Sequence, residues 1–408
     1  MQRIIKRIFL LSLSLSTVVF ALMGYAQTSI PDEISISQSG KISSGAIFTY
    51  EISNGKIRTF SDSADDESYE LNVRLFDAIP VKKTKVLLSE RKYVTVSGDV
   101  FGIKMYTDGV MVVANETILT SNGSQVSPGE SAGMKPGDII KLVNSKKVTS
   151  SAELARAISE SEGKKAVLTV IRDGKQQQIV IQPVLSKNEG KYKIGLWVRD
   201  STAGIGTMTF FDRENGTFAG LGHAVCDVDT GFEMPISNGD AVKAQIKGCY
   251  KGKPGTPGEL IGIFDNGSIG KLYYNGETGI YGVLDSYDKN ATQTPVAVED
   301  EIKRGEAEII CTVDGSGAQK YSVEIERIYK TGGSVKNMVV RITDEELLSL
   351  TGGIVQGMSG TPIIQNGMFV GAITHVFVND PTRGYAIFAE NMVVTAQEVY
   401  NDVLKKAS

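Results

Sequence analysis

The stretch GMSGTP, residues 357–362, places a single hydroxyl with catalytic potential, that of Ser359, among residues typical of a tight turn. Glycines let a chain bend closely, so that backbone N–H groups can gather around a developing oxyanion. A serine is a weak nucleophile at its own pKa and therefore also needs a nearby base. Because Gly, Ser and Pro are equally typical of ordinary turns, the hypothesis of a nucleophilic serine depends on finding that base.

The search for a base is short, because the chain contains only two histidines. His223 lies between glycines and a carboxylate-bearing turn in AGLGHAVCDVDTG, residues 219–231, whereas His375 lies inside an apparent strand, VGAITHVFV. A histidine within a strand is more often a packed or hydrogen-bonded residue than a catalyst. We therefore predict that His223 is the base.

The composition is that of a globular protein rich in turns. Of 408 residues, 41% are hydrophobic and 22% are charged, which is enough to bury a sizeable core in two or three domains. The 44 glycines favour a β-rich architecture. The net charge is −4 and we find no basic cluster interleaved with aromatic residues, which argues against binding to nucleic acid.

The N-terminal sequence is typical of an exported protein. Arg3, Lys6 and Arg7 precede an uncharged run from residue 8 to residue 26, so we interpret residues 1–27 as a signal peptide or a membrane anchor. Cleavage after Ala26 and retention as an anchor both fit this pattern. Either alternative places the rest of the chain outside the cytoplasm.

The following segments divide into a linker and two small domains. Residues 28–68 are polar and end near SDSADDES, which predicts a flexible linker that is easily cut, and residues 69–97 predict a small β unit. Residues 98–185 combine a strand, a helix with a Ser150/Glu153 capping box, and a hairpin turning at Asp173-Gly174. From residue 190 to 408, short hydrophobic stretches alternate with turns, which predicts an all-β barrel or sandwich.

Residues 98–185, with the phrase AGMKPGDII, resemble a PDZ domain of the kind attached to bacterial exported proteases. Such a domain is expected to hold a chain terminus as an added strand beside its helix. The resemblance suggests Phe101, Gly102 and Ile103 for the loop that binds the terminal carboxylate. Alternatively, the protein's own segments fill this groove.

The segments GMSGTPII, MFVGAITHV and GLGHAV resemble the active-site pieces of trypsin-like serine proteases. With GIKMYTDGVMVV, GLWVRDSTAGIGTMTF and the long motif TGGIVQGMSGTPIIQNGMFVGAITHVFVNDPTRGYAIF, nearly the whole chain resembles the stage IV sporulation protein B peptidase family. The resemblance implies a mainly β protein, in which a trypsin-like double β-barrel follows an α+β PDZ domain and the small N-terminal β unit.

The same resemblance implies a function. It suggests a serine endopeptidase of sporulation, exported from the forespore into the space between the two spore membranes. There it would cut itself and a membrane-bound regulatory protein, and so trigger pro-sigma-K processing in the mother cell. No cofactor is implied.

The resemblance also assigns roles to residues. Ser359 is the expected nucleophile, His223 the base, and the N–H groups of Gly357 and Ser359 the oxyanion hole. It places the third triad member at Asp344, fifteen residues before the serine. Asp344 also has the sequence context of a helix N-cap. The alternative acids are Asp227, Asp229 and Asp285.

Two other classes of function were weighed. A zinc site at His223 and Cys226 would need further ligands, and the remaining His and Cys residues offer no recognisable metal spacing. Cys226, Cys249 and Cys311 also give no disulfide framework, and the sequence does not single out which two would bridge in an oxidising compartment. A catalytically inactive PDZ scaffold that binds peptide termini of membrane partners is the alternative to the enzyme, and labelling of Ser359 by a fluorophosphonate distinguishes the two.

Overall fold

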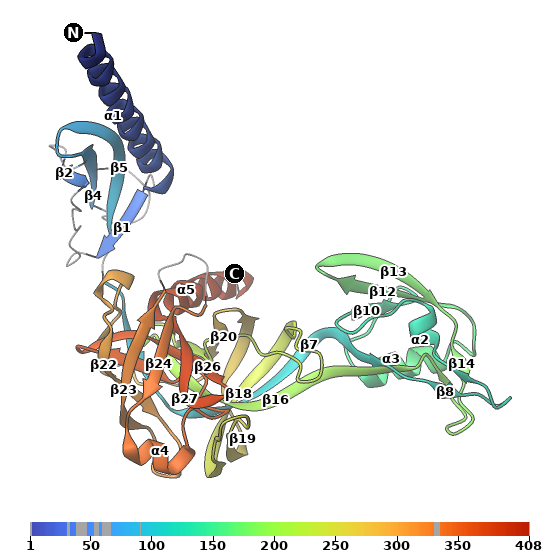
Figure 1. The fold of residues 1–408 in the computed structure, drawn as a ribbon. Helices are drawn as coiled ribbons and strands as arrows, with labels where there is room; N and C mark the ends of the chain where they lie inside the picture. The colour runs from blue at the N-terminus through green and yellow to red at the C-terminus, as the bar shows by residue number, and fades with distance from the viewer. Residues whose placement is uncertain are drawn as a thin grey trace. The chain divides into compact units, whose positions relative to one another are not determined.

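The computed structural model describes residues 2–30, 33–37, 47–52, 57–58, 67–89, 91–329 and 335–407 (Figure 1). The chain divides into two compact units, residues 1–92 and 93–408. The candidate catalytic residues all lie in the second unit, which is mainly β.

The first unit combines a helix with a small sheet. Helix α1 (Gln2–Ser29) is followed by a sheet whose strands lie in the order β1 (Glu33–Ser37), β5 (Ile79–Ser89), β4 (Glu67–Leu75) and β2 (Phe48–Ile52), with β3 (Ile57–Arg58) pairing to β4. Three of these strands fall in the segment 28–68 that was predicted to be a flexible linker. Most of SDSADDES lies outside the described residues. Among the helices of the described residues, none combines the length and apolar character needed to cross a membrane.

The C-terminal third of the second unit contains a closed barrel of antiparallel strands. In order around the barrel these are β22 (Gly305–Cys311), β23 (Gln319–Ile328), β24 (Met338–Ile342), β27 (Asp380–Phe388), β26 (Met368–Phe377) and β25 (Pro362–Gln365). Inward-facing side chains from successive strands, such as Ile309, Val323 and Val340, fill its interior. Helix α4 (Glu345–Thr351) lies in the connection between β24 and β25.

The strand pairings close a second ring before this barrel. The ring runs β7 (Val100–Asn115), β18 (Ile236–Tyr250), β19 (Glu259–Gly276), β20 (Gly279–Leu284), β17 (Thr217–Gly220) and β16 (Leu196–Phe211), and β16 pairs back to β7. Its interior holds Phe101, Ile103 and Phe218. Strand β6 (Tyr93–Val96) extends the sheet beyond β16 and pairs with β21 (Thr294–Pro295), which precedes the short 3-10 helix η1 (Glu299–Glu301). The expected double β-barrel is thus present.

The PDZ domain is inserted into the first barrel rather than placed before it. Strand β7 belongs to the barrel up to Thr107, and its end from Val110 pairs with β10 (Ile139–Val143) of the PDZ sheet. Strand β16 returns along β7 from Asn115 to Val100, and Figure 1 shows the two long strands side by side. The predicted domain boundary at residue 98 therefore separates strand β7 from the barrel to which it belongs. The sequence could not reveal this, because a continuous β-rich stretch gives no signal at the point where one domain passes into the next.

The PDZ domain itself follows the sequence closely. Its sheet contains β10 (Ile139–Val143), β11 (Lys146–Lys147), β12 (Ala166–Arg172) and β13 (Lys175–Ile181). Its helices are α2 (Pro128–Ser131) and α3 (Ser151–Ser159). Two short strand pairs complete the domain: β8 (Ile118–Leu119) pairs with β9 (Gln125–Val126), and β14 (Val184–Leu185) pairs with β15 (Tyr192–Lys193). Ser150 caps α3 by accepting the N–H of Glu153. Asp173 and Gly174 turn the β12–β13 hairpin with φ of 49° and 71°, as a two-residue turn requires.

A further hydrophobic cluster joins the two barrels and the C-terminal helix. Phe210 of β16 packs on Phe369 of β26 with ring centroids 5.6 Å apart, and Met392 of α5 (Ala389–Ala407) belongs to the same cluster. The helix includes the valines at 393 and 394, although β-branched residues have low helix propensity, because this helix packs on the barrels. Burial of this face fixes the two barrels against each other.

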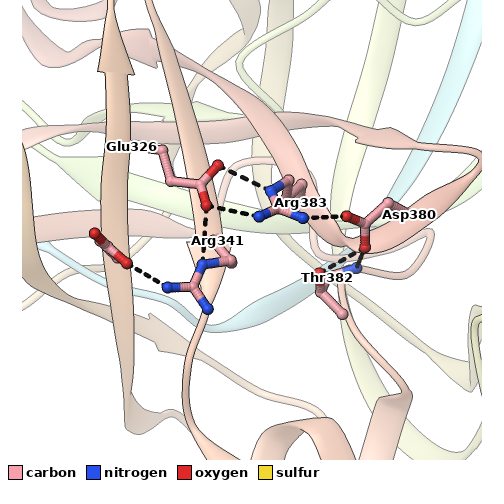
Figure 2. Close-up of polar contacts among 6 residues, drawn as sticks. Glu326, Arg341, Asp380, Thr382 and Arg383 are labelled. Carbon is pink, nitrogen blue, oxygen red and sulfur yellow. Dashed lines mark hydrogen bonds and ion pairs between the residues drawn. The ribbon is translucent and has the colours of Figure 1, made fainter.

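Charged side chains tie together the strands on one side of the second barrel (Figure 2). Glu326 of β23 accepts two hydrogen bonds of 2.9 Å from Arg383 of β27 and forms an ion pair with Arg341 of β24. Arg383 also pairs with Asp380, whose other oxygen accepts the hydroxyl of Thr382 at 2.6 Å. These contacts hold the β26–β27 hairpin, whose Pro381 carbonyl accepts the N–H of Ile354.

Candidate active site

Ser359 lies in the turn between α4 and β25, at the junction of the two barrels. Its side chain is partly buried, and its Oγ donates a hydrogen bond of 2.8 Å to the carbonyl of Thr374 on β26. The turn contains Gly357 and Gly360 with φ of 98° and 93°, a region that other residues rarely adopt. The sequence forms this turn because only glycine fits at these two positions.

His223 lies in the loop that follows β17 of the first barrel. Leu221 and Gly222, both with positive φ, bend the chain just before it. Its Nδ1 lies 2.8 Å from the carbonyl of Ala224, and a carbonyl can only accept, so Nδ1 carries the proton and Nε2 has the free lone pair. Burial lowers the pKa of His223 from its ordinary value, although the Ala224 carbonyl opposes the shift. The imidazole is thus held neutral, in the tautomer of a proton acceptor.

Close backbone packing brings the serine and histidine loops together. A Cβ at Gly360 would lie 2.4 Å from the backbone nitrogen of Leu221, and a Cβ at Gly222 would lie 2.9 Å from the side chain of Thr374. A larger residue at Gly360 would push the serine turn away from the histidine loop, and one at Gly222 would push the histidine loop away from β26. The structure therefore places the loops that carry Ser359 and His223, one from each barrel, in backbone contact.

His375 joins the same cluster from strand β26. Its ring centroid lies 4.7 Å from that of His223. Desolvation of the ring, with repulsion from His223 and Lys336, lowers the pKa of His375 to about 4, although the residue as a whole remains exposed. The second histidine is therefore a neutral neighbour of the first.

The carbonyl groups of the serine turn all face partners in the barrels. They accept hydrogen bonds from the following donors: Leu260 N–H to Gln356, Thr207 Oγ1 to Gly357, Thr361 N–H to Met358, Thr207 N–H to Ser359, and Thr209 Oγ1 to Gly360, at distances of 2.7 to 3.0 Å. Because every carbonyl from Gln356 to Gly360 accepts a hydrogen bond, the orientation of these peptide planes is fixed.

The N–H groups of the same turn alternate between used and unused. Those of Met358 and Gly360 donate to the carbonyls of Val355 and Ile373. Those of Gly357 and Ser359 donate to no acceptor in the part of the chain that the structure describes. Two unused N–H groups, one on the serine itself and one two residues before it, are the kind of donors that an oxyanion hole needs.

Thr207 and Thr209 were missed by the sequence interpretation. Their spacing of two in GTMTF places both side chains on one face of strand β16. That spacing was visible in the sequence, but which distant loop the two hydroxyls would reach was not.

The candidate acids are engaged elsewhere. Asp344 caps α4, accepting the N–H of Leu347 at 3.0 Å and that of Ser322 at 3.2 Å. The structure thus shows Asp344 in its capping role, and the described hydrogen bonds of His223 include none to a carboxylate.

The three alternative acids also have other partners. Asp227 is buried, forms an ion pair with Arg199 and accepts two hydrogen bonds from Thr230. Asp229 pairs with the same arginine, and Asp285 accepts the hydroxyl of Ser268 at 3.3 Å. The group that orients His223 in this structure is the Ala224 carbonyl.

Phe101, Gly102 and Ile103 do not lie at the PDZ groove. They are in the barrel part of β7, paired on one edge with β16 and on the other with β18, and the side chains of Phe101 and Ile103 are buried in the barrel core. The prediction of a carboxylate-binding loop here is wrong, because no strand edge remains for a peptide to join.

The space beside helix α3 lies instead against the beginning of β16. A cavity of about 290 Å³ is lined by Leu154 and Ile158 of α3 and by Leu196 and Val198 of β16. Asp200 of β16 accepts the N–H and the hydroxyl of Ser151, which also lines the cavity. The protein's own strand therefore forms one wall of the groove.

Comparison with known protein families shows the family of this chain. Residues 190–393, which contain both the serine and the histidine loop, match the family described as SpoIVB peptidase S55. The chain belongs to this family. Residues 102–182 match the PDZ domain family, so this member of the S55 family carries a PDZ domain.

Individual relatives match shorter parts. The chain is 33% identical over 98 residues to "Putative zinc metalloprotease LL2128" of Lactococcus lactis subsp. lactis (strain IL1403), covering 24% of this chain and 21% of that protein. It is 32% identical over 109 residues to "Putative zinc metalloprotease BR1156/BS1330_I1152" of Brucella suis biovar 1 (strain 1330), covering 26% and 28%. The chain thus spans less than a third of the length of these relatives.

Two solved structures also match. The PDZ domain of the SdrC-like protein Lmo2051 from Listeria monocytogenes covers 22% of this chain and 87% of its own, with 22% identity and a TM-score of 0.17. The HtrA-type protease AlgW with a decapeptide covers 53% of this chain and 56% of its own, with 14% identity and a TM-score of 0.30.

Proposed function

We propose that this S55 peptidase cuts peptide bonds with Ser359 as nucleophile and His223 as general base. One observation carries the proposal: Gly360 of the serine turn packs on Leu221 of the histidine loop, and the serine turn leaves the N–H groups of Gly357 and Ser359 unused among the described residues. These are the parts that acyl transfer requires, namely a nucleophile, a base and an oxyanion site.

The proposed reaction begins when Ser359 Oγ leaves the Thr374 carbonyl and turns to Nε2 of His223. The oxygen attacks the peptide carbonyl while Nε2 takes the hydroxyl proton, and the N–H groups of Gly357 and Ser359 bind the oxyanion. Each such donor contributes about 3–4 kcal/mol to stabilising the transition state. His223 then gives its proton to the leaving amine, and water hydrolyses the acyl-enzyme by the same steps.

In this proposal the Ala224 carbonyl takes over part of the work of a triad acid. It keeps the imidazole in the tautomer whose Nε2 accepts, and it stabilises the imidazolium by accepting Nδ1–H. A carbonyl carries only a partial charge, so it stabilises the cation less than a carboxylate does. Asp344 has no part in this site as the structure describes it.

The cellular role is proposed from the family. We infer a sporulation endopeptidase exported from the forespore into the intermembrane space, with residues 1–27 as signal or anchor. It would cut its own N-terminal region and a membrane-bound regulator, and so trigger pro-sigma-K processing in the mother cell. The PDZ groove beside α3 would hold a peptide terminus of such a partner.

The test is labelling with a fluorophosphonate probe followed by mass spectrometry of the intact chain. Wild type and Ser237→Ala, which changes an exposed serine, are expected to react at Ser359. Ser359→Ala is expected not to react, and His223→Ala to react far more slowly, while both keep the wild-type thermal midpoint. Labelling of folded Ser359→Ala at the wild-type rate would remove the serine from its role, and absence of label on wild type would favour the inactive scaffold.

A further inference from the structure

Thr207 of strand β16 contacts both loops of the active site. Its hydroxyl donates to the carbonyl of Gly357 at 2.9 Å, and its N–H donates to the carbonyl of Ser359 at 3.0 Å. Its own carbonyl accepts the N–H of Leu221, at the start of the histidine loop, at 3.3 Å. The residue is 1% exposed, so these contacts form away from water.

The hydroxyl of Thr207 holds the peptide plane that lies between the two proposed oxyanion donors. The carbonyl of Gly357 belongs to the peptide group joining Gly357 to Met358, and the donor N–H groups of Gly357 and Ser359 lie on either side of it. If this plane rotates, the backbone angles that aim both donors change with it. Glycine at 357 offers little resistance to such a rotation, because it lacks a Cβ.

We propose that Thr207 is a positioning residue for catalysis. Its hydroxyl fixes the oxyanion donors, and its main chain sets the separation of the serine and histidine loops. The inference rests on the roles of Ser359 and His223 proposed above and adds a residue from the first barrel that touches neither substrate nor the reacting atoms.

The matched substitutions separate the hydroxyl from the shape of the side chain. Thr207→Val keeps the shape but leaves the Gly357 carbonyl without its donor, and Thr207→Ser keeps the hydroxyl. Thr217→Val is the control, because Thr217 is a buried threonine on the neighbouring strand β17 whose hydroxyl has no partner among the described residues. Thr207→Ala is made in parallel, since it introduces no new contact.

The measurement is the rate of fluorophosphonate labelling of Ser359 as a function of probe concentration. We expect the maximal rate for Thr207→Val and Thr207→Ala to fall roughly 10²-fold, because small displacements of catalytic groups have effects of this size. The half-saturating concentration of probe is expected to stay near wild type. Thr207→Ser is expected to restore most of the rate, and Thr217→Val to match wild type, at comparable thermal midpoints.

The possible outcomes decide between the proposals. A wild-type maximal rate in either folded variant, Val or Ala, overturns the positioning role while leaving Ser359 and His223 in place. Equal loss in the Ser and Val variants overturns the role of the hydroxyl and assigns the effect to packing. If wild type itself is not labelled, the proposed function fails and the role of Thr207 fails with it.

Discussion

Both carboxylate oxygens of Asp344 accept backbone N–H groups within its own barrel, those of Leu347 and Ser322. We expect Asp344→Ala to lower the free energy of unfolding by about 1 kcal/mol, which is the usual cost of losing an N-cap. The rate of labelling at Ser359 is expected to stay near wild type. Asp344→Asn is the matched control, because an amide oxygen also caps a helix. A stable but unreactive Asp344→Asn variant would return Asp344 to the triad.

The pH dependence of activity reports on His223. Burial lowers its pKa, so the imidazole remains an acceptor at pH values where a free histidine, with a pKa of 6.5, is protonated. The acidic limb of the labelling rate is therefore expected below pH 6.5. His375→Gln is expected to leave the base working, because His375 is neutral down to about pH 4. An acidic limb at or above pH 6.5 would contradict the buried, neutral base.

The residue types of the site were readable from the sequence, but their partners were not. Glycines around Ser359 and His223 indicated close backbone approach, and Gly360 is where the serine turn contacts the histidine loop, while Gly222 lies against β26. An aspartate before a helix, however, looks the same whether it caps the helix or reaches a histidine. Only the positions of the N–H groups of Leu347 and Ser322, which the structure provides, show that Asp344 caps the helix.

The network of Glu326 ties three strands of the second barrel. Hydrogen bonds from Arg383 lower the pKa of Glu326 despite partial desolvation, and Arg341 adds to the effect. Glu326→Gln removes the charge that both arginines share, so we expect a loss of about 1–2 kcal/mol in the free energy of unfolding, limited by the solvent exposure of the arginines. The measurement is urea unfolding of the two proteins.

The pH dependence of this contribution has a definite sign. The folded pKa of Glu326 lies below the ordinary value of 4.5, so the contribution is present above pH 4.5 and is lost as the pH falls through the folded pKa. The difference between wild type and Glu326→Gln is therefore expected to be constant from pH 6 to 7 and to shrink below pH 4.5. Lys320, whose ion pair with Glu308 is exposed, offers a control in Lys320→Gln, which is expected to have little effect.

Elements with strong local signals followed the sequence, and the exceptions depend on distant contacts. The cap at Ser150, the turn at Asp173-Gly174 and the end of α4 at Gly352 are each determined by a few neighbouring residues. Residues 100–107 of β7 instead belong to the first barrel because they pair with β16 and β18, two strands that lie far along the chain. Sequence pattern identifies such a strand but not the sheet that it joins.

On the scale of the whole molecule, β7 and β16 are shared by the PDZ domain and the first barrel. Strand β16 runs from the groove beside α3, where Asp200 contacts Ser151, to Thr207 and Thr209 at the serine turn. One strand therefore connects the peptide-binding domain to the proposed oxyanion hole. The PDZ domain can be removed without loss of the barrel only at the point where both strands cross between the two domains.

The register of the two strands defines that point and leads to the last prediction. Ser201 pairs with Tyr106, and the β7–β16 register shifts between Ser201 and Arg199, so Thr107 and Asp200 are the first residues beyond the regular β7–β16 pairing of the barrel. Replacing residues 108–198 with Asn-Gly connects Thr107 to Asp200 through a short glycine-containing loop. Arg199 is kept, because it pairs with the buried Asp227 in the histidine loop.

This shortened variant is expected to fold and to label at Ser359 at a rate near wild type, because the closed ring and the contacts of Thr207 remain. Deletion of residues 98–185, the boundaries suggested by sequence, removes Phe101, Ile103 and Met105 from the barrel core and one strand from its ring. That deletion is expected to abolish both cooperative unfolding and labelling. A barrel that has lost three buried side chains and one strand could not keep its active site in place. If the 98–185 deletion labelled normally while the shortened variant did not fold, β7 would therefore not be a strand of the catalytic barrel.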